Sequence, residues 1–305
     1  MTDYADLIDS ATWGFINRTL SYYADDACDQ SIAKQRRMYD QMCAAFRQPV
    51  PAGVMTQDDE INAVPVRHYT RTDDPDQDTV IIYFHGGGFV VGGLDSHDDV
   101  CAELCAGTGI AVVNVDYRLA PEYVAPAQSL DCLAVVRAIA ARERRRIILV
   151  GDSAGGYLAA DLSRHLRGGD VTIAGQVLIY PGLGGDTNHG SYITHAQAPL
   201  LTTEDVLFYH EMLYPEGSEQ GPEPLQETDF SSLPPTMVMA AACDPLCDDS
   251  VQYHAALTAA GVPCRLHVET GLVHGFLRAR HSVPRAAQAF DRIIIACRDL
   301  AVGAL

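Results

Sequence analysis

The stretch from Arg146 to Tyr157 constrains the fold more than any other part of the sequence. It begins with four apolar and mostly β-branched residues, Ile147 to Val150, which are typical of a strand buried on both faces of a parallel sheet. The run Gly151-Asp152-Ser153-Ala154-Gly155-Gly156 follows at once, and a helix-forming segment comes after it. A G-x-S-x-G run at this place predicts a sharp strand-to-helix turn, in which small residues let the backbone cross closely. We therefore expect Ser153 to be an exposed nucleophile, although so short a pattern also occurs in ordinary loops.

Strands and helices alternate along most of the chain, which implies an α/β fold with a mostly parallel central sheet flanked by helices. Two extended segments, near Val54–Thr56 and Ala63–Thr70, come before this alternation. The expected strands are Thr79–Phe84, Ile110–Val115, Ile147–Val150, Gln176–Tyr180, Thr236–Ala242 and Arg265–Glu269. The expected helices are Asp98–Ala106 (closed by Gly107), Ala125–Arg142, Ala154–Leu166, Asp248–Ala260 and Pro284–Leu300.

Two regions stand outside this alternation. Residues 1–48 carry two apolar faces at helical spacing, and residues 185–230 are an insertion around one helix, Thr202–Leu213, which Thr202 caps together with Asp205. We expect residues 1–48 and 185–230 to form a helical cap over the catalytic end of a core made of residues 49–184 and 231–305, all within one catalytic domain. Ordinary surface decoration is the alternative.

Composition excludes several classes of protein. The chain has 305 residues, of which 48% are hydrophobic, and a formal net charge of −19 with a single lysine, Lys34. So acidic a surface repels phosphates, so we expect no nucleic-acid partner and no membrane partner. An acidic, lysine-poor surface would also suit a protein that works at high salt concentration. No signal-peptide-like run and no span of transmembrane length are evident, so we expect a cytoplasmic protein. The nine scattered cysteines are typical of reduced thiols in that compartment. We expect neither a metal nor another cofactor.

A serine hydroxyl needs a general base to act as a nucleophile, and the base needs an orienting carboxylate. In open parallel sheets such groups stand at the carboxyl ends of strands. Asp244 directly follows an expected strand, and His274 follows the last one, in a loop flanked by glycines. Asp248 and Asp249 are rival carboxylates, but they open a helix, where the helix dipole explains them. The order Ser153, Asp244, His274 is that of an α/β-hydrolase.

The run His85-Gly86-Gly87-Gly88 directly follows the strand Thr79–Phe84 and predicts an anion site for a tetrahedral intermediate. Such a site needs backbone N–H groups aimed at one point, and glycines allow the close approach. We assign the N–H groups of Gly87, Gly88 and Ala154 to this oxyanion hole. His85 is expected to hold the loop by hydrogen bonds, and a merely flexible turn is the alternative.

Taken together, these motifs resemble the bacterial hormone-sensitive-lipase-like carboxylesterases of the α/β-hydrolase superfamily. The resemblance covers about residues 50 to 300. The motifs that carry it are His85-Gly86-Gly87-Gly88, Asp116-Tyr117-Arg118-Leu119-Ala120-Pro121-Glu122, Gly151-Asp152-Ser153-Ala154-Gly155-Gly156, Asp244-Pro245-Leu246 and His274-Gly275-Phe276. It implies an α/β-hydrolase fold with a helical cap, and a metal-free serine esterase acting on short acyl chains. By the same resemblance, Tyr117 and Arg118, with His85 and Gly86, would support the glycine loop.

The expected partner is a small-molecule ester, and a homodimer is favoured by the resemblance alone. An amidase or deacetylase with the same triad remains open, because an amine leaving group changes only the pocket. A non-catalytic small-molecule receptor on this fold also remains open, since fold alone does not fix function. The aromatic residues Phe208, Tyr209 and Trp13 are candidates for the substrate pocket, although core packing explains each equally well.

Overall fold

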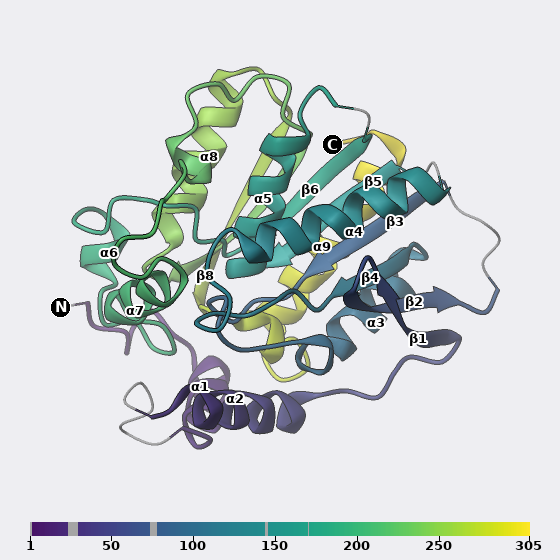
Figure 1. Ribbon diagram of the computed structural model, residues 1–305. Helices are drawn as coiled ribbons and strands as arrows, with labels where there is room; N and C mark the ends of the chain where they lie inside the picture. Colours follow the sequence, from purple (N-terminus) through teal and green to yellow (C-terminus); the bar gives the residue numbers. More distant parts are fainter. Residues whose placement is uncertain (1, 24–29, 74–77, 144–145, 170) are drawn as a thin grey trace.

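An eight-stranded sheet forms the centre of the molecule (Figure 1). The computed structural model describes residues 2–23, 30–73, 78–143, 146–169 and 171–305. The strand order is β1-β2-β4-β3-β5-β6-β7-β8, and only β2 runs against the others. The strands are β1 Val54–Ile61, β2 Val64–Arg71, β3 Thr79–Phe84, β4 Ala111–Val115, β5 Arg146–Asp152, β6 Ile173–Ile179, β7 Thr236–Cys243 and β8 Cys264–Val273. The predicted mostly parallel sheet is confirmed.

Helices cover both faces of the sheet because its central strands are apolar on both sides. In β3, Ile81 and Tyr83 pack on one face, while Val80, Ile82 and Phe84 pack on the other. The first face is covered by α3 Asp98–Thr108 and α9 Pro284–Val302, and the second by α4 Ala127–Glu143, α5 Ala154–Leu166 and α8 Cys247–Ala259. Figure 1 shows these two layers of helices on either side of the sheet.

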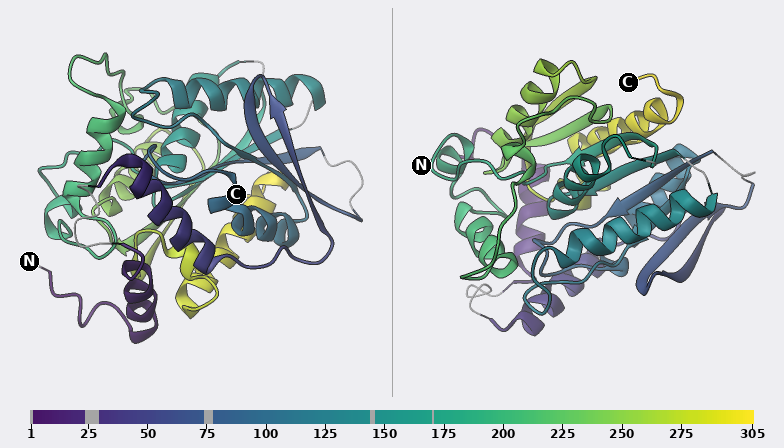
Figure 2. Two further views of the ribbon diagram at one scale, coloured as in Figure 1. Left: turned by 60° about the horizontal axis from the view of Figure 1, so that its bottom comes forward. Right: turned by 45° about the horizontal axis from the view of Figure 1, so that its top comes forward.

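The remaining helices gather at one end of the sheet, as the views of Figure 2 show together with Figure 1. They are α1 Ser10–Leu20 and α2 Ile32–Phe46 from the N-terminal region, with α6 Ser191–Thr194 and α7 Thr203–Leu213 from the insertion. Thr202 and Asp205 form the predicted capping box at the start of α7. Both segments predicted as a cap, residues 1–48 and 185–230, thus contribute helices here, and we refer to them as the cap segments.

Several boundaries differ from the prediction for physical reasons. The hairpin of β1 and β2 is longer than expected, because β1 is exposed and polar and gives no alternating signal. Helix α3 ends at Gly109, in the left-handed region with φ 75°, and not at Gly107. Gly107 instead makes room for the side chain of Ile294, which a Cβ would approach to 2.6 Å.

No helix in the described ranges combines the length and apolar character needed to cross a membrane. The described residues also form the short 3₁₀ helices η2 Leu94–Ser96, η3 Pro224–Gln226 and η4 Phe276–Ala279. Helices η2 and η4 follow the glycine loop and His274, so they lie close to the predicted site in sequence.

Candidate active site

Ser153 stands at the predicted turn between β5 and α5, and its backbone is strained there. Its φ of 54° and ψ of −118° are unusual for a residue with a side chain. Two glycines make the turn possible, since a Cβ on Gly151 would collide with the backbone of Gly155, and one on Gly155 with the backbone of Phe84. The Ser153 N–H donates to the carbonyl of Ile179, 2.8 Å away, which fixes the turn against β6. The turn therefore presents Ser153 at the N-terminus of α5.

The side chains of Ser153, His274 and Asp244 form one hydrogen-bonded chain. Ser153 Oγ lies 2.9 Å from His274 Nε2, and His274 Nδ1 lies 2.7 Å from Asp244 Oδ2. Asp244 is fully buried, and its other oxygen accepts the N–H of Leu246 at 2.9 Å. With Nδ1 donating to the carboxylate, Nε2 is left to accept from the serine. The ring of Tyr180 packs against the imidazole with centroids 4.8 Å apart.

Asp248 and Asp249 take no part in this chain, but the sequence explanation for Asp249 was incomplete. Asp249 is fully buried and accepts hydrogen bonds from Leu183 N at 2.6 Å and from Tyr192 Oη at 3.1 Å. Burial raises the pKa of its carboxyl to about 7. Asp248 accepts from Ser191 N at 2.9 Å. Both residues therefore fix loops beside the site, beyond any interaction with the helix dipole.

The glycine loop adopts backbone conformations that need glycine. Gly87 has φ 127° and Gly88 has φ 58°, both in the region that side chains disfavour. A Cβ on Gly87 would collide with the backbone of Val91, and one on Gly88 with the ring of Tyr209 from α7. Within the described part of the chain, the N–H groups of Gly87 and Gly88 donate to no other residue, so both are available for a ligand.

His85 lies under this loop and is fully buried. Its ring stacks on Tyr117 with centroids 4.3 Å apart, and its Nδ1 lies 2.8 Å from the carbonyl of Gly86. Tyr117 Oη donates to the carbonyl of His85 at 2.6 Å. Burial lowers the pKa of His85 to about 3, so the ring is neutral. Arg118 differs from the other loop-support residues, because its guanidinium pairs with Asp131 of α4 and does not contact the glycine loop.

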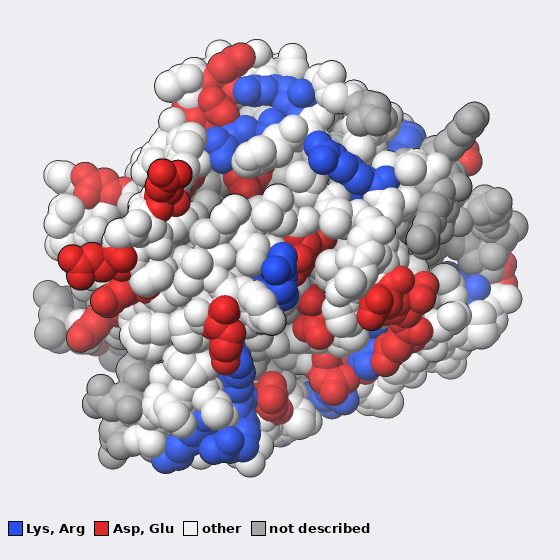
Figure 3. All heavy atoms as spheres, viewed as in Figure 1, with Lys and Arg blue, Asp and Glu red and all other residues white. Residues whose placement is uncertain are grey.

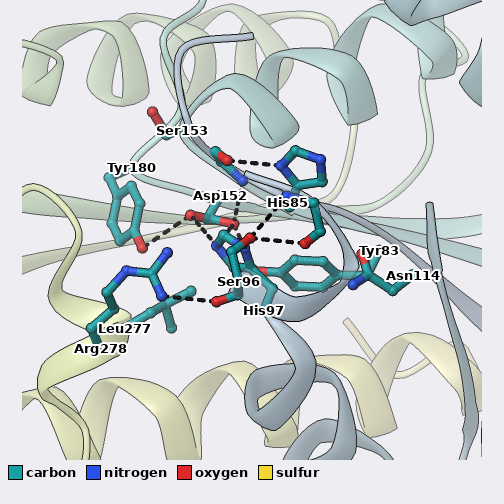
Figure 4. A network of polar contacts seen from close by, with 12 residues as sticks. Tyr83, His85, Ser96, His97, Asn114, Asp152, Ser153, Tyr180, Leu277 and Arg278 are labelled. Atoms are coloured by element: carbon teal, nitrogen blue, oxygen red, sulfur yellow. Dashed lines mark hydrogen bonds and ion pairs between the residues drawn. The ribbon is translucent and has the colours of Figure 1, made fainter. Parts of the chain in front are cut away.

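Asp152 is a site residue that the sequence analysis missed, although it lies beside Ser153. Its carboxylate accepts hydrogen bonds from Gly86 N at 2.9 Å, Tyr83 Oη at 2.7 Å and Tyr180 Oη at 3.4 Å, and Oδ2 lies 3.3 Å from Nε2 of His97. Figure 4 shows this carboxylate at the centre of a polar network beneath Ser153. The alternation of side chains along a strand, which sends Asp152 away from Ser153, was the signal available in the sequence.

A cavity of about 810 Å³ opens beside Ser153 and His274. Its walls come from both cap segments and are mostly apolar; they include Phe15, Met38, Met42, Val206, Tyr209 and Leu213. Of the three pocket candidates, Tyr209 lines the cavity, whereas Phe208 and Trp13 do not. Trp13 packs instead against the main hydrophobic core, and Phe208 packs edge-on against Tyr209. Among the described residues, no group of three or more His, Cys, Asp and Glu side chains is arranged to hold a metal ion.

A parallel sheet that presents serine, aspartate and histidine at its strand ends, beside a glycine loop with free N–H groups, defines a hydrolase of the α/β-hydrolase class. Residues 81–278 match the family model described as the alpha/beta hydrolase fold. Esterase LipI of Mycobacterium tuberculosis is 36% identical over 269 residues, which are 83% of this chain and 84% of that protein. Ethyl acetate hydrolase of Pseudomonas putida is 33% identical over 251 residues, 78% of this chain and 79% of that protein.

A solved structure agrees with this fold. The crystal structure of DphMB1 has a TM-score of 0.88 and 33% identity, covering 98% of this chain and 99% of that one. The chain belongs to the hormone-sensitive-lipase-like carboxylesterase family of the α/β-hydrolase fold. It is a carboxylic ester hydrolase.

Proposed function

We propose that the protein hydrolyses short-chain acyl esters with Ser153 as nucleophile, His274 as general base and Asp244 as the carboxylate that orients the base. The observation that carries this proposal is the hydrogen-bonded chain from Ser153 Oγ through His274 to Asp244, with distances of 2.9 and 2.7 Å. Both distances lie within the range over which protons are transferred between oxygen and nitrogen.

The reaction proceeds in two acyl-transfer steps. His274 Nε2 takes the proton from Ser153 as the hydroxyl oxygen attacks the ester carbonyl, and Asp244 stabilises the imidazolium. The tetrahedral intermediate collapses when His274 returns that proton to the leaving alcohol, which gives an acyl-enzyme. Water then repeats the sequence and releases the acid, so the enzyme is regenerated without a cofactor.

The N–H groups of Gly87, Gly88 and Ala154 are proposed to bind the oxyanion of both intermediates. The free N–H groups of the glycine loop support this role, as does the position of Ala154 as the first residue of α5, where the helix N-terminus favours negative charge. Gly86, His85 and Tyr117 hold the loop in place through the contacts described above.

A preference for short acyl chains is supported by the way the cap closes the cavity. Tyr209 lies directly over Gly88, so the space above the oxyanion hole is limited by an aromatic ring. One relative, at 33% identity, carries the name ethyl acetate hydrolase, which describes a two-carbon acyl group. The partner in this proposal is a small-molecule ester.

The test is hydrolysis of p-nitrophenyl esters from acetate to palmitate by the wild type and by Ser153→Ala. We expect activity that peaks at short chains and disappears in the variant, since removing the nucleophile leaves only residual catalysis. Ser163→Ala is the matched control, because Ser163 lies further along α5 and donates to Gln176, away from the site. Full activity in Ser153→Ala would refute the nucleophile, and a maximum at palmitate would refute the chain-length preference.

A further inference from the structure

The cavity beside Ser153 also contains the guanidinium of Arg278, which the proposed mechanism does not use. Arg278 belongs to η4, four residues after His274, and is the only lysine or arginine among the described residues that line the cavity. Nη1 donates to the carbonyl of Ser96 at 2.9 Å, and Nη2 to Tyr39 Oη at 2.7 Å. Figure 4 shows the guanidinium close to Tyr180 and Asp152, at the base of the site.

Arg278 keeps spare hydrogen-bond donors. A guanidinium carries five N–H bonds, and within the described chain the side chain donates only to Ser96 and to Tyr39. It forms no ion pair with a carboxylate of the described residues. The charge of Arg278 helps to lower the pKa of the Asp152 carboxyl, but no hydrogen bond joins the two side chains among the described residues, and the Asp152 oxygens already accept from Tyr83, Gly86 and Tyr180 and pair with His97.

The other carboxylates along the cavity are occupied by their own partners. Asp205 accepts from the backbone and hydroxyl of Thr202 at the start of α7. Glu223 accepts from Gln220 at 3.0 Å and lies 3.6 Å from Nε2 of His210. The cationic end of the cavity therefore lies at Arg278, between α2 and η4, and the acidic groups elsewhere are neutralised or hydrogen-bonded locally.

Enclosing the charged guanidinium of Arg278 costs free energy, and a ligand that accepts hydrogen bonds from its unused N–H groups offsets this cost. The planar fork of arginine matches the two oxygens of a carboxylate, which it binds more strongly than a neutral acceptor. We propose that Arg278 recognises a carboxylate carried by the substrate, so that the preferred substrates are anionic esters, either monoesters of dicarboxylic acids or O-acylated hydroxy acids. This inference rests on the proposed ester hydrolysis at Ser153 and names the class of ester.

Matched substrates test the proposal. The first series is the monomethyl esters of succinic, glutaric and adipic acid, which carry the charge on the acyl arm, and the second is 3-acetoxypropanoate and 4-acetoxybutanoate, which carry it on the alcohol arm. Each is compared with the neutral ester of the same chain length, such as methyl hexanoate for monomethyl adipate. We expect the ratio of kcat/KM, anionic over neutral, to exceed one in at least one series, and that series identifies the arm that faces Arg278.

Variants of Arg278 separate recognition from a structural role. Arg278→Met should lower this ratio by about thirtyfold, the size expected for hydrogen bonds to a charged group. Arg278→Lys should retain part of the preference, since the charge remains without the fork. Arg265→Met is the control, because it removes the same kind of side chain from a pair with Asp299 that does not line the cavity, and its ratio should stay close to that of the wild type. The ratio does not depend on the fraction of folded enzyme.

Binding gives a readout that does not depend on catalysis. Calorimetric titration of the Ser153→Ala protein with monomethyl adipate and with methyl hexanoate should show tighter binding of the anion, lost in Ser153→Ala/Arg278→Met. A ratio of one or less in both series, or a preference that survives Arg278→Met, would overturn the subsite. Failure of the wild type to hydrolyse any ester would refute the proposed function instead, and the titration would still decide whether Arg278 binds carboxylates.

Discussion

Asp152 and Ser153 are neighbours in sequence, but their side chains lie on opposite sides of the turn between β5 and α5 (Figure 4). Burial alone would raise the pKa of the Asp152 carboxyl, but its electrostatic interaction and hydrogen bond with His97, the hydrogen bond from Tyr83 and the nearby guanidinium of Arg278 outweigh burial and hold the pKa below its usual range. The carboxylate is therefore ionised at neutral pH, and its bond to Gly86 N fixes the start of the glycine loop. Asp152 thus positions the glycine loop, which is the proposed oxyanion hole, next to the proposed nucleophile Ser153.

Asp152→Asn is expected to lower kcat by roughly tenfold to hundredfold with little change in KM, because a displaced oxyanion loop weakens binding of the transition state more than of the substrate. The asparagine amide cannot satisfy the donors that meet at this carboxylate. Steady-state kinetics on a short p-nitrophenyl ester measure the two constants separately. Asp131→Asn is the control, since Asp131 pairs with Arg118 away from the loop. A raised KM with unchanged kcat in Asp152→Asn would contradict a positioning role.

At the scale of helices and strands, hydrogen bonds to side chains hold the loops beside the site against the cap segments. Asp249, in the first turn of α8, accepts from Leu183 and Gly185 in the loop after β6 and from Tyr192 of α6. Gly182, Gly184 and Gly185 of that loop line the cavity. One buried carboxyl therefore links a core helix to a cap segment and to the wall of the cavity.

This carboxyl gives stability a pH dependence whose sign can be derived. The pKa of Asp249 is raised by burial from an ordinary value near 3.8 to about 7, so the folded state holds a proton that the unfolded state has lost. The stabilisation is complete below about pH 4 and is lost as the pH rises toward 7. Asp249→Asn resembles the protonated acid and should remove this loss. We expect the variant to gain about 1 kcal/mol per pH unit relative to the wild type between pH 5 and 7.

Urea unfolding of both proteins at pH 5, 6, 7 and 8 measures this difference, and subtraction cancels every other titrating group. An advantage for Asp249→Asn that is smallest at pH 5, grows up to about pH 7 and then levels off is the expected pattern. A constant deficit of Asp249→Asn at all four values would show that the native carboxyl is ionised throughout and stabilises the loop as an anion.

The sequence was sufficient for those features that local chemistry dictates. The turn at Ser153, the strand-end positions of Asp244 and His274, and the glycine loop all follow from residue types and their neighbours. Partners brought together by the tertiary fold were not predictable in this way, which is why the contacts of Asp152 and Arg278 were missed. Phe208 was a wrong choice within the right helix: Val206, Tyr209 and Leu213, spaced as one helical face, line the cavity, and Phe208 lies off that face.

Across the whole molecule, the net charge of −19 means that repulsion among acidic side chains is stronger than their attraction to the fewer basic ones. Figure 3 shows acidic side chains spread over the visible face and basic side chains in several groups, one of them at the lower left near α2, which carries Lys34, Arg36 and Arg37. Many arginines are paired near the surface; Arg71, for example, lies 2.7 Å from Asp73, and Arg36 lies 2.6 Å from Glu122. Exposed pairs of this kind contribute little stability, whereas the unpaired excess of acidic groups opposes compaction.

Salt should therefore stabilise the protein. Raising NaCl from 0.01 to 0.5 M shortens the distance over which charges interact from about 30 Å to a few ångströms, and this weakens repulsion across the surface more than contacts between touching ions. We expect the melting temperature at pH 8 to rise by about 2 °C or more, the shift that roughly 1 kcal/mol produces in a large domain. The effect should shrink at pH 5, close to the sequence isoelectric point of about 4.7. Thermal melts followed by circular dichroism measure both, and a melting temperature that falls with salt at pH 8 would show that the arginine–carboxylate pairs outweigh the net repulsion.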